Sequence, residues 1–242
     1  MDKQVIDSAM KNLENTMQSQ PLSNETPCDI CGADGKKVEV DGIIGTLCNN
    51  GECLAKARMK VCEKKENRKQ ARIHELIVSS GIPPKYRNIT TDRKYKHLVN
   101  DKGVFIYGSN AGTGKTVMAC SIAIEHMKQV RKATFKSVPT IVMELQDSFR
   151  KESGDESAYD KLKELAQVEV LVLDDLGAEK MTDFVRQSLY YLINEREQWD
   201  RTTIITSNYT LEEIGNNLDS RLASRIAGMC AVINLKGKDR RL

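Results

Sequence analysis

The stretch Gly108-Ser109-Asn110-Ala111-Gly112-Thr113-Gly114-Lys115-Thr116 decides the expected fold of this 242-residue chain. It follows an apolar run at residues 104–107 and leads into a helical pattern over residues 116–129, so a glycine-rich turn joins a predicted strand to a predicted helix. A turn of this kind aims backbone N–H groups and a helix N-terminus at a phosphate chain. We therefore expect a P-loop that binds ATP through residues 109–116.

Two side chains of the loop have specific expected roles. Lys115 should contact the β- and γ-phosphates, and the Thr116 hydroxyl should bind Mg²⁺. Ser109 departs from the usual pattern, which has glycine at that position, while Gly108 stands one residue earlier. This departure predicts some strain in the turn. The alternative is a glycine-rich turn that binds nothing.

Polar residues follow two further apolar runs. Asp174 and Asp175 end the run at residues 168–173, and Asn208 follows the run at residues 202–206. At the carboxyl edge of a sheet, Asp174 would hold Mg²⁺ through water and Asp175 would orient or deprotonate the attacking water. Asn208 would fix that water from the other side. The plainer alternative is that both groups simply begin turns.

The run of strands and helices indicates an α/β domain. Strands are expected at residues 104–107, 133–138, 168–173, 202–206 and 231–235, with helices between them, including residues 116–129 and 182–199. This alternation predicts a parallel sheet covered by helices on both faces. We expect this domain over residues 79–242 and a smaller module over residues 1–78. The module should begin with an amphipathic helix at residues 1–19 and end in a basic connector helix that includes residues 56–72.

Four cysteines in the module have the spacing of a metal site. Cys28 and Cys31 form a Cys-x2-Cys pair, and Cys48 and Cys53 follow as Cys-x4-Cys. Four thiolates around Zn²⁺ would compensate for the small number of large apolar residues in this segment. Cys62 is a possible replacement ligand. The alternative is a set of unligated thiols.

Composition narrows the setting of the protein. Hydrophobic residues make up 40% and charged residues 29%, and no apolar run is long enough to span a bilayer. The polar start of the chain lacks the layout of a secretory signal. These features predict a cytoplasmic protein without a membrane partner. The net charge of +3 means that any affinity for nucleic acid must come from local clusters of charge.

Taken together, the P-loop, Asp174-Asp175, Ser207-Asn208 and the segment 220–225 resemble AAA+ ATPases of the DnaC/DnaI type, the replicative-helicase loaders of bacteria and phages. The resemblance covers about residues 80–242 and includes the lead-in at residues 81–86. It implies a P-loop AAA+ three-layer α/β/α domain. It also implies that Asp174 holds Mg²⁺, that Asp175 is the catalytic base and that Asn208 is sensor 1.

The same resemblance assigns roles to four arginines. Arg225 matches the arginine finger, which reaches the γ-phosphate bound by a neighbouring subunit, and Arg221 on the same predicted helix is the second choice. Arg240 or Arg241 matches sensor 2. Because Asp175 stands where glutamate is usual, we expect slow hydrolysis that depends on assembly.

The resemblance further implies partners. These are a hexameric replicative DNA helicase held by the zinc-bearing module, single-stranded DNA held by the ATPase domain, and further copies of the chain in an ATP-dependent homo-oligomer. The basic run at residues 56–72 would contribute to phosphate binding, or be a solvated connector. Two other functions stay open: an IstB-like transposition helper ATPase, and an adaptor that binds nucleotide with negligible turnover.

Overall fold

The structure is a computed structural model that describes residues 26–40, 43–48, 50–100, 103–148 and 157–237. Contacts divide the chain into two compact units, residues 1–71 and 72–242. This contact boundary lies within the long helix α2, Gly51–Ser79, and so comes before the boundary predicted after residue 78. The helix predicted over residues 1–19 lies outside the described residues.

The first unit contains an antiparallel sheet that the sequence did not predict. Its strands β1, β2 and β3 lie side by side in that order and are followed by α2. The strand bounds are Thr26–Pro27, Asp34–Val40 and Ile43–Leu47. Cys53, Ala57 and Val61 lie on one face of α2, because they are spaced by four residues, and they share a small core with Val38 and Leu47.

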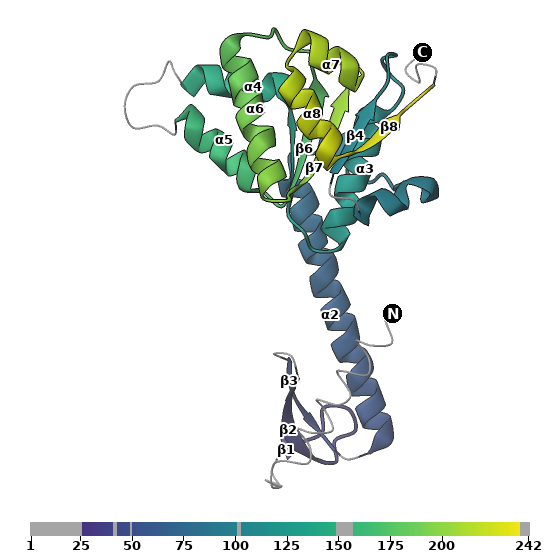
Figure 1. Ribbon diagram of the computed structural model, residues 1–242. Helices are drawn as coiled ribbons and strands as arrows, with labels where there is room; N and C mark the ends of the chain where they lie inside the picture. Colours follow the sequence, from purple (N-terminus) through teal and green to yellow (C-terminus); the bar gives the residue numbers. More distant parts are fainter. Residues whose placement is uncertain (1–25, 41–42, 49, 101–102, 149–156, 238–242) are drawn as a thin grey trace. The chain divides into compact units, whose positions relative to one another are not determined.

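The second unit is built on a parallel sheet (Figure 1). Within the described residues this sheet has five strands in the order β5-β6-β7-β4-β8. The strands are β4 Gly103–Tyr107, β5 Ala133–Ser137, β6 Val170–Leu176, β7 Thr202–Ser207 and β8 Ala231–Asn234. All five predicted strands are therefore confirmed.

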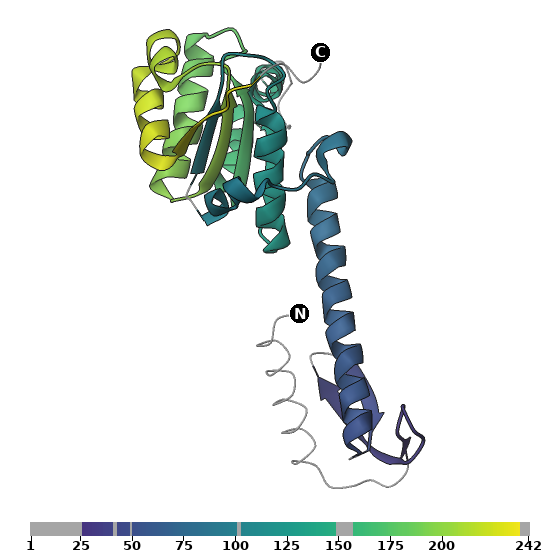
Figure 2. The ribbon, with the colours of Figure 1, turned by 90° about the vertical axis from the view of Figure 1, so that its right-hand side faces the viewer.

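Helices cover both faces of this sheet. Figure 2 shows α3 on one face and α6 and α8 on the other. The helices are η1 Pro84–Tyr86, η2 Arg93–Asn100, α3 Lys115–Lys128, α4 Val138–Ser148, α5 Ala158–Gln167, α6 Asp183–Gln198, α7 Leu211–Asn217 and α8 Ser220–Met229. The predicted three-layer α/β/α architecture is confirmed. Among the helices that the structure describes, none is long and apolar enough to cross a membrane.

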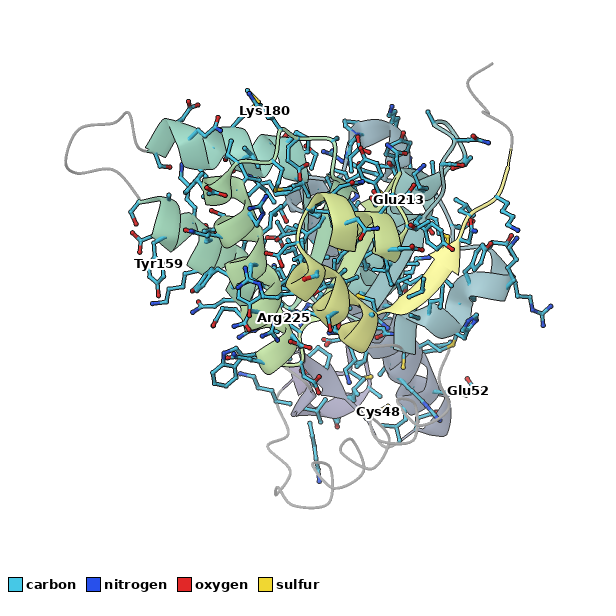
Figure 3. The ribbon with its side chains drawn as sticks, turned by 45° about the horizontal axis from the view of Figure 1, so that its top comes forward. Cys48, Glu52, Tyr159, Lys180, Glu213 and Arg225 are labelled. Carbon is cyan, nitrogen blue, oxygen red and sulfur yellow. The ribbon has the colours of Figure 1, made fainter. Side chains whose placement is uncertain are left out.

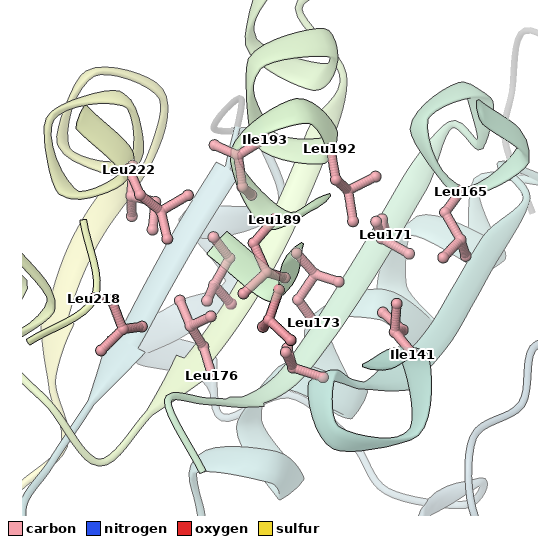
Figure 4. Close-up of a cluster of buried hydrophobic side chains, with 14 of the residues drawn as sticks. Ile141, Leu165, Leu171, Leu173, Leu176, Leu189, Leu192, Ile193, Leu218 and Leu222 are labelled. Carbon is pink, nitrogen blue, oxygen red and sulfur yellow. The ribbon is translucent and has the colours of Figure 1, made fainter. Parts of the chain in front are cut away.

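The larger core lies between the sheet and α4, α5, α6 and α8. Leu189 and Leu192 of α6 face Leu171 and Leu173 of β6 (Figure 4), and all four side chains are at most 2% exposed. Burying a leucine side chain contributes about 1.5–3 kcal/mol. This packing fixes β6, and with it the aspartates at its end.

A charged side chain, Arg196 of α6, is completely buried in this layer. Burial lowers the pKa of its guanidinium. Hydrogen bonds compensate, because the guanidinium donates to the carbonyl oxygens of Leu165 (3.0 Å), Ala166 (3.2 Å), Val168 (2.9 Å) and Thr202 (2.6 Å) and to Oγ1 of Thr203 (2.9 Å). Arg196 thus joins the end of α5 to the start of β7.

The edge strand β5 has a backbone neighbour from the segment that follows α2. The Phe135 N–H donates to the Ser80 carbonyl oxygen at 2.7 Å. Gly81 lies close by with φ +84°, and a Cβ atom there would stand 2.7 Å from the Phe135 carbonyl oxygen. Only glycine permits this approach without strain.

Candidate nucleotide and cysteine sites

A cavity of about 270 Å³ lies at the carboxyl ends of the central strands. The P-loop forms one wall through residues 111–117, and Asp175, Thr206 and Asn208 form another. In open α/β sheets, ligands bind at this edge. The structure therefore brings the predicted loop, the second aspartate and the predicted sensor asparagine to one cavity.

Within the loop, Lys115 is held close to the backbone. Its Nζ donates to the carbonyl oxygens of Gly108 at 2.8 Å and Asn110 at 3.0 Å, and the residue is 7% exposed. The ammonium group thus lies inside the turn. This is the position from which a lysine contacts β- and γ-phosphates.

Ser109 does not cause the strain that we expected. The described non-glycine residues with positive φ are Val130, Asp175 and Asp200, and Ser109 is not among them. The glycine is required one residue earlier, because a Cβ atom on Gly108 would stand 2.6 Å from the Leu235 carbonyl oxygen. The loop needs glycine where it passes the segment after β8, and Ser109 itself is exposed.

Asp174 accepts hydrogen bonds from two threonines. The Thr116 hydroxyl donates to Oδ2 at 3.2 Å and the Thr206 hydroxyl donates to Oδ1 at 2.7 Å. Burial raises the pKa of Asp174, and these two hydrogen bonds partly oppose that effect. A cation next to the carboxylate would offset the cost of burial. Asp174 and Thr116 therefore fit the predicted magnesium site.

Asp175 lies at an irregularity of β6. The register between β6 and β7 shifts between Leu173 and Leu176, and Asp175 has φ +66°. In a regular strand, neighbouring side chains point to opposite faces; this bulge instead turns the Asp175 carboxylate into the cavity. Asn208 Nδ2 stands 3.4 Å from Asp175 Oδ1, so the predicted base and sensor lie in contact.

Tyr86 of η1 also lines the cavity, although it is distant from the P-loop in the sequence and had no predicted role. The available signal was an aromatic residue that ends the lead-in at residues 81–86. Nothing in the spacing could show that this lead-in folds back to the cavity.

The structure describes two of the four predicted arginines. Arg221 and Arg225 are both on α8, as predicted, and neither lines the cavity within the described part of the chain. Arg240 and Arg241 lie outside the described residues. The nearby Gly237 carbonyl oxygen accepts a hydrogen bond from Asn110 Nδ2 of the P-loop at 3.3 Å.

In the first unit, the sulfur atoms of Cys28, Cys31, Cys48 and Cys53 all lie within 4.8 Å of one another. Cys31 Sγ and Cys48 Sγ are 3.6 Å apart. Four sulfurs bound to one zinc at 2.3 Å would be about 3.8 Å apart. Cys62 is buried on α2 and does not belong to this group of four.

The thiols of this cluster differ in acidity. Backbone N–H groups of Ile30, Cys31 and Cys48 lower the pKa of Cys28 to about 6, so it ionises readily. Hydrogen bonding to Cys31, together with burial, raises the pKa of Cys53 to about 12. Crowded thiols cannot all ionise without a compensating cation, and a zinc ion would supply two positive charges. The donor set therefore fits zinc.

Comparison with known proteins agrees with the second unit. The sequence model of the IstB-like ATP-binding protein family matches residues 58–242, which excludes the cysteine cluster. The replicative helicase loader DnaI of Bacillus subtilis (strain 168) is 30% identical over 162 residues, which are 62% of this chain and 50% of DnaI. The replicative helicase loader DnaC of Escherichia coli (strain K12) is 25% identical over 122 residues, which are 50% of this chain and 49% of DnaC.

A solved structure is similar as well. The crystal structure of the DnaC helicase loader superposes with a TM-score of 0.51 at 28% identity, over 60% of this chain and 85% of that one. The present chain spans about half the length of the two curated relatives. The cavity, the AAA+ architecture and these matches lead to one conclusion: the chain belongs to the family of IstB-like ATP-binding proteins, and its AAA+ core is of the DnaC/DnaI type.

Proposed function

We propose that the protein is an ATP-dependent loader of the hexameric replicative DNA helicase. The observation that carries this proposal is the cavity in which Lys115, Asp175 and Asn208 meet, in a chain similar to proteins named as helicase loaders. Hydrolysis of ATP at this site would be the switch that changes the affinity for the helicase.

The proposal assigns a role to each side chain, and the position of each side chain supports that role. Lys115 and the P-loop amides bind the phosphates, Thr116 and Asp174 hold Mg²⁺, and Asp175 takes a proton from the attacking water. When bound by Thr116 and Asp174, Mg²⁺ would supply positive charge that stabilises the negative charge of the phosphates. Asn208 holds the water in line.

Other residues complete this site. The Tyr86 ring offers an apolar wall against which the adenine base packs. Arg225 acts as the arginine finger on ATP bound by a neighbouring copy, so hydrolysis requires a homo-oligomer. Arg240 or Arg241 would act as sensor 2, which is supported by the hydrogen bond between Asn110 and the nearby Gly237.

The first unit binds the helicase, with its fold held by zinc on the four clustered cysteines. We expect the purified chain to contain about one zinc ion, since the four thiol sulfurs lie within 4.8 Å of one another and four thiolates are a common ligand set for structural zinc. Metal analysis by mass spectrometry should show most of the zinc lost in Cys31→Ser and retained in Cys62→Ser, a buried cysteine of the same unit. Equal zinc contents in the two variants would contradict the assignment.

Binding to the helicase tests the main proposal. Full-length protein should co-purify with the hexameric replicative helicase of its host in the presence of ATP, and the amount bound should change with ADP or without nucleotide. Cys31→Ser should weaken binding to the helicase while ATP binding persists, and Cys62→Ser should leave both intact. Absence of a complex in every nucleotide state would refute the loader function.

Single-stranded DNA is the second proposed partner, and the ATPase unit is its proposed site. On α2, the residues 56–72 include exposed lysines and arginines that would add phosphate contacts. Binding that rests on such contacts should weaken steeply as the salt concentration rises.

A second candidate function comes from the matching family itself. An IstB-like transposition helper would bind duplex DNA and a transposase rather than the helicase. The cysteine cluster lies before the matched residues 58–242 and gives the chain a unit outside that family match. Stable binding to duplex DNA, with no binding to the helicase, would favour this candidate.

A further inference from the structure

Five side chains between α6 and α8 form one connected polar cluster. Arg225 donates from Nη2 to the Tyr190 hydroxyl at 2.9 Å and forms an ion pair with Glu197. Arg221 lies over the same tyrosine ring, 4.7 Å from its centre, and pairs with Asp219 at 2.8 Å. Arg225, labelled in Figure 3, also lies near this ring. Its guanidinium carbon is 5.1 Å from the ring centre. Tyr190 therefore contacts both arginines of α8.

The two arginines are held differently. Arg221 has a side chain 64% exposed, and its partner Asp219 is fixed in place because it caps the N-terminus of α8. Arg225 is only 29% exposed, and its partner Glu197 comes from the opposite helix α6. The Tyr190 hydroxyl and then Glu197 raise the pKa of Arg225, so its charged form is favoured where it lies. Arg225 is thus bound within its own subunit.

A guanidinium in this position must exchange partners before it can reach a phosphate of another copy. Glu197 carries one negative charge and the γ-phosphate of ATP carries more, so the exchange is favourable only when a neighbour brings its nucleotide close. The Glu197 side chain is 31% exposed, which leaves the ion pair accessible and limits its strength. The ion pair therefore favours the position of Arg225 against its own subunit, and it can break when a phosphate competes for the guanidinium.

We propose that Glu197 and Tyr190 are positioning residues. They hold Arg225 against its own subunit when that subunit is isolated, which we call the parked position, and they release it when a second copy with bound ATP docks. This inference rests on the proposed role of Arg225 as a finger acting between subunits. A charge-assisted contact at a half-exposed position should shift the equilibrium between parked and released Arg225 by about three- to tenfold. The rate of hydrolysis would then rise more steeply with subunit assembly than it would if docking of the subunits were the only step.

Phosphate release measured against protein concentration tests the proposal. Glu197→Gln keeps the shape of the side chain and removes its charge, so half-maximal hydrolysis should occur at about three- to tenfold lower protein concentration than in wild type. Asp183→Asn is the matched control, because it breaks an exposed ion pair with Arg186 on the same helix α6. Its curve should match wild type. Tyr190→Phe keeps the ring and loses the hydroxyl, and should shift the curve in the same direction by less.

The possible outcomes distinguish the finger role of Arg225 from the positioning role of Glu197 and Tyr190. Adding Arg225→Ala to Glu197→Gln should abolish the gain. If Arg225→Ala alone leaves the concentration dependence unchanged, Arg225 is not a finger and that part of the proposed function fails. If Arg225→Ala is inactive but both Glu197→Gln and Tyr190→Phe follow the wild-type curve, or need more protein, the parking role is wrong and the finger stands. Should Glu197→Gln fail to fold, Tyr190→Phe alone decides by the same criterion.

Discussion

Replacing Asp175 with asparagine should reduce ATP hydrolysis by about 10²- to 10⁴-fold, the usual contribution of a general base. Asparagine is the right replacement, because Asp175 has φ +66° and asparagine tolerates this left-handed conformation, whereas alanine would strain it. Nucleotide binding should persist, since Lys115 and the P-loop are unchanged. Phosphate release and binding of a fluorescent ATP analogue measure the two effects.

The chain offers a matched control for this variant. Asp200 also has a positive φ, +53°, and lies at the end of α6 outside the cavity. Asp200→Asn should hydrolyse ATP at the wild-type rate. If wild type, Asp175→Asn and Arg225→Ala all show the same background rate, the protein is an adaptor that binds nucleotide without turnover.

Replacing Arg196 with methionine should lower the free energy of unfolding by about 3–5 kcal/mol. The substitution removes the donors for four carbonyl oxygens and one hydroxyl, all in a layer that water does not reach. Loss of the buried charge offsets part of this cost. Chemical denaturation followed by circular dichroism measures the effect.

Lys163→Met on α5 is the comparison for this experiment. Lys163 is exposed, so its replacement should change the free energy of unfolding by less than about 0.5 kcal/mol. If Arg196→Met changes the free energy of unfolding by an equally small amount, the prediction is wrong, and the five hydrogen-bond acceptors of Arg196 must find other donors.

The sequence predicted the second unit well, because its central strands β4, β6 and β7 are largely buried and therefore consist of apolar runs. The runs at β4, β6 and β7 and the loop at residues 108–116 were sufficient to place the P-loop, Asp174 and Asn208 at one edge. Features without a periodic signal could not be predicted. The bulge that turns Asp175 into the cavity depends on the pairing of β6 with β7, which no local pattern encodes.

The first unit shows a different limit. Strands β2 and β3 each contain one glycine, and β2 begins with charged residues, so neither forms a long alternation of apolar and polar residues that identifies a half-buried strand. The cysteine spacing was a better guide, since ligand geometry constrains it directly. The usual P-loop pattern has its first glycine at position 109, whereas this structure requires glycine at position 108. The requirement arises from contact with Leu235, which is distant in the sequence.

The segment Ser80-Gly81 has a consequence for how copies of this chain associate. An edge strand with free N–H and C=O groups is a template on which another chain can add a strand. Here the Phe135 N–H of β5 already donates to Ser80, and Gly81 lies against the Phe135 carbonyl oxygen. A second copy that extended the sheet at β5 would have to displace this segment. The chain thus carries its own protection against sheet extension at the β5 edge.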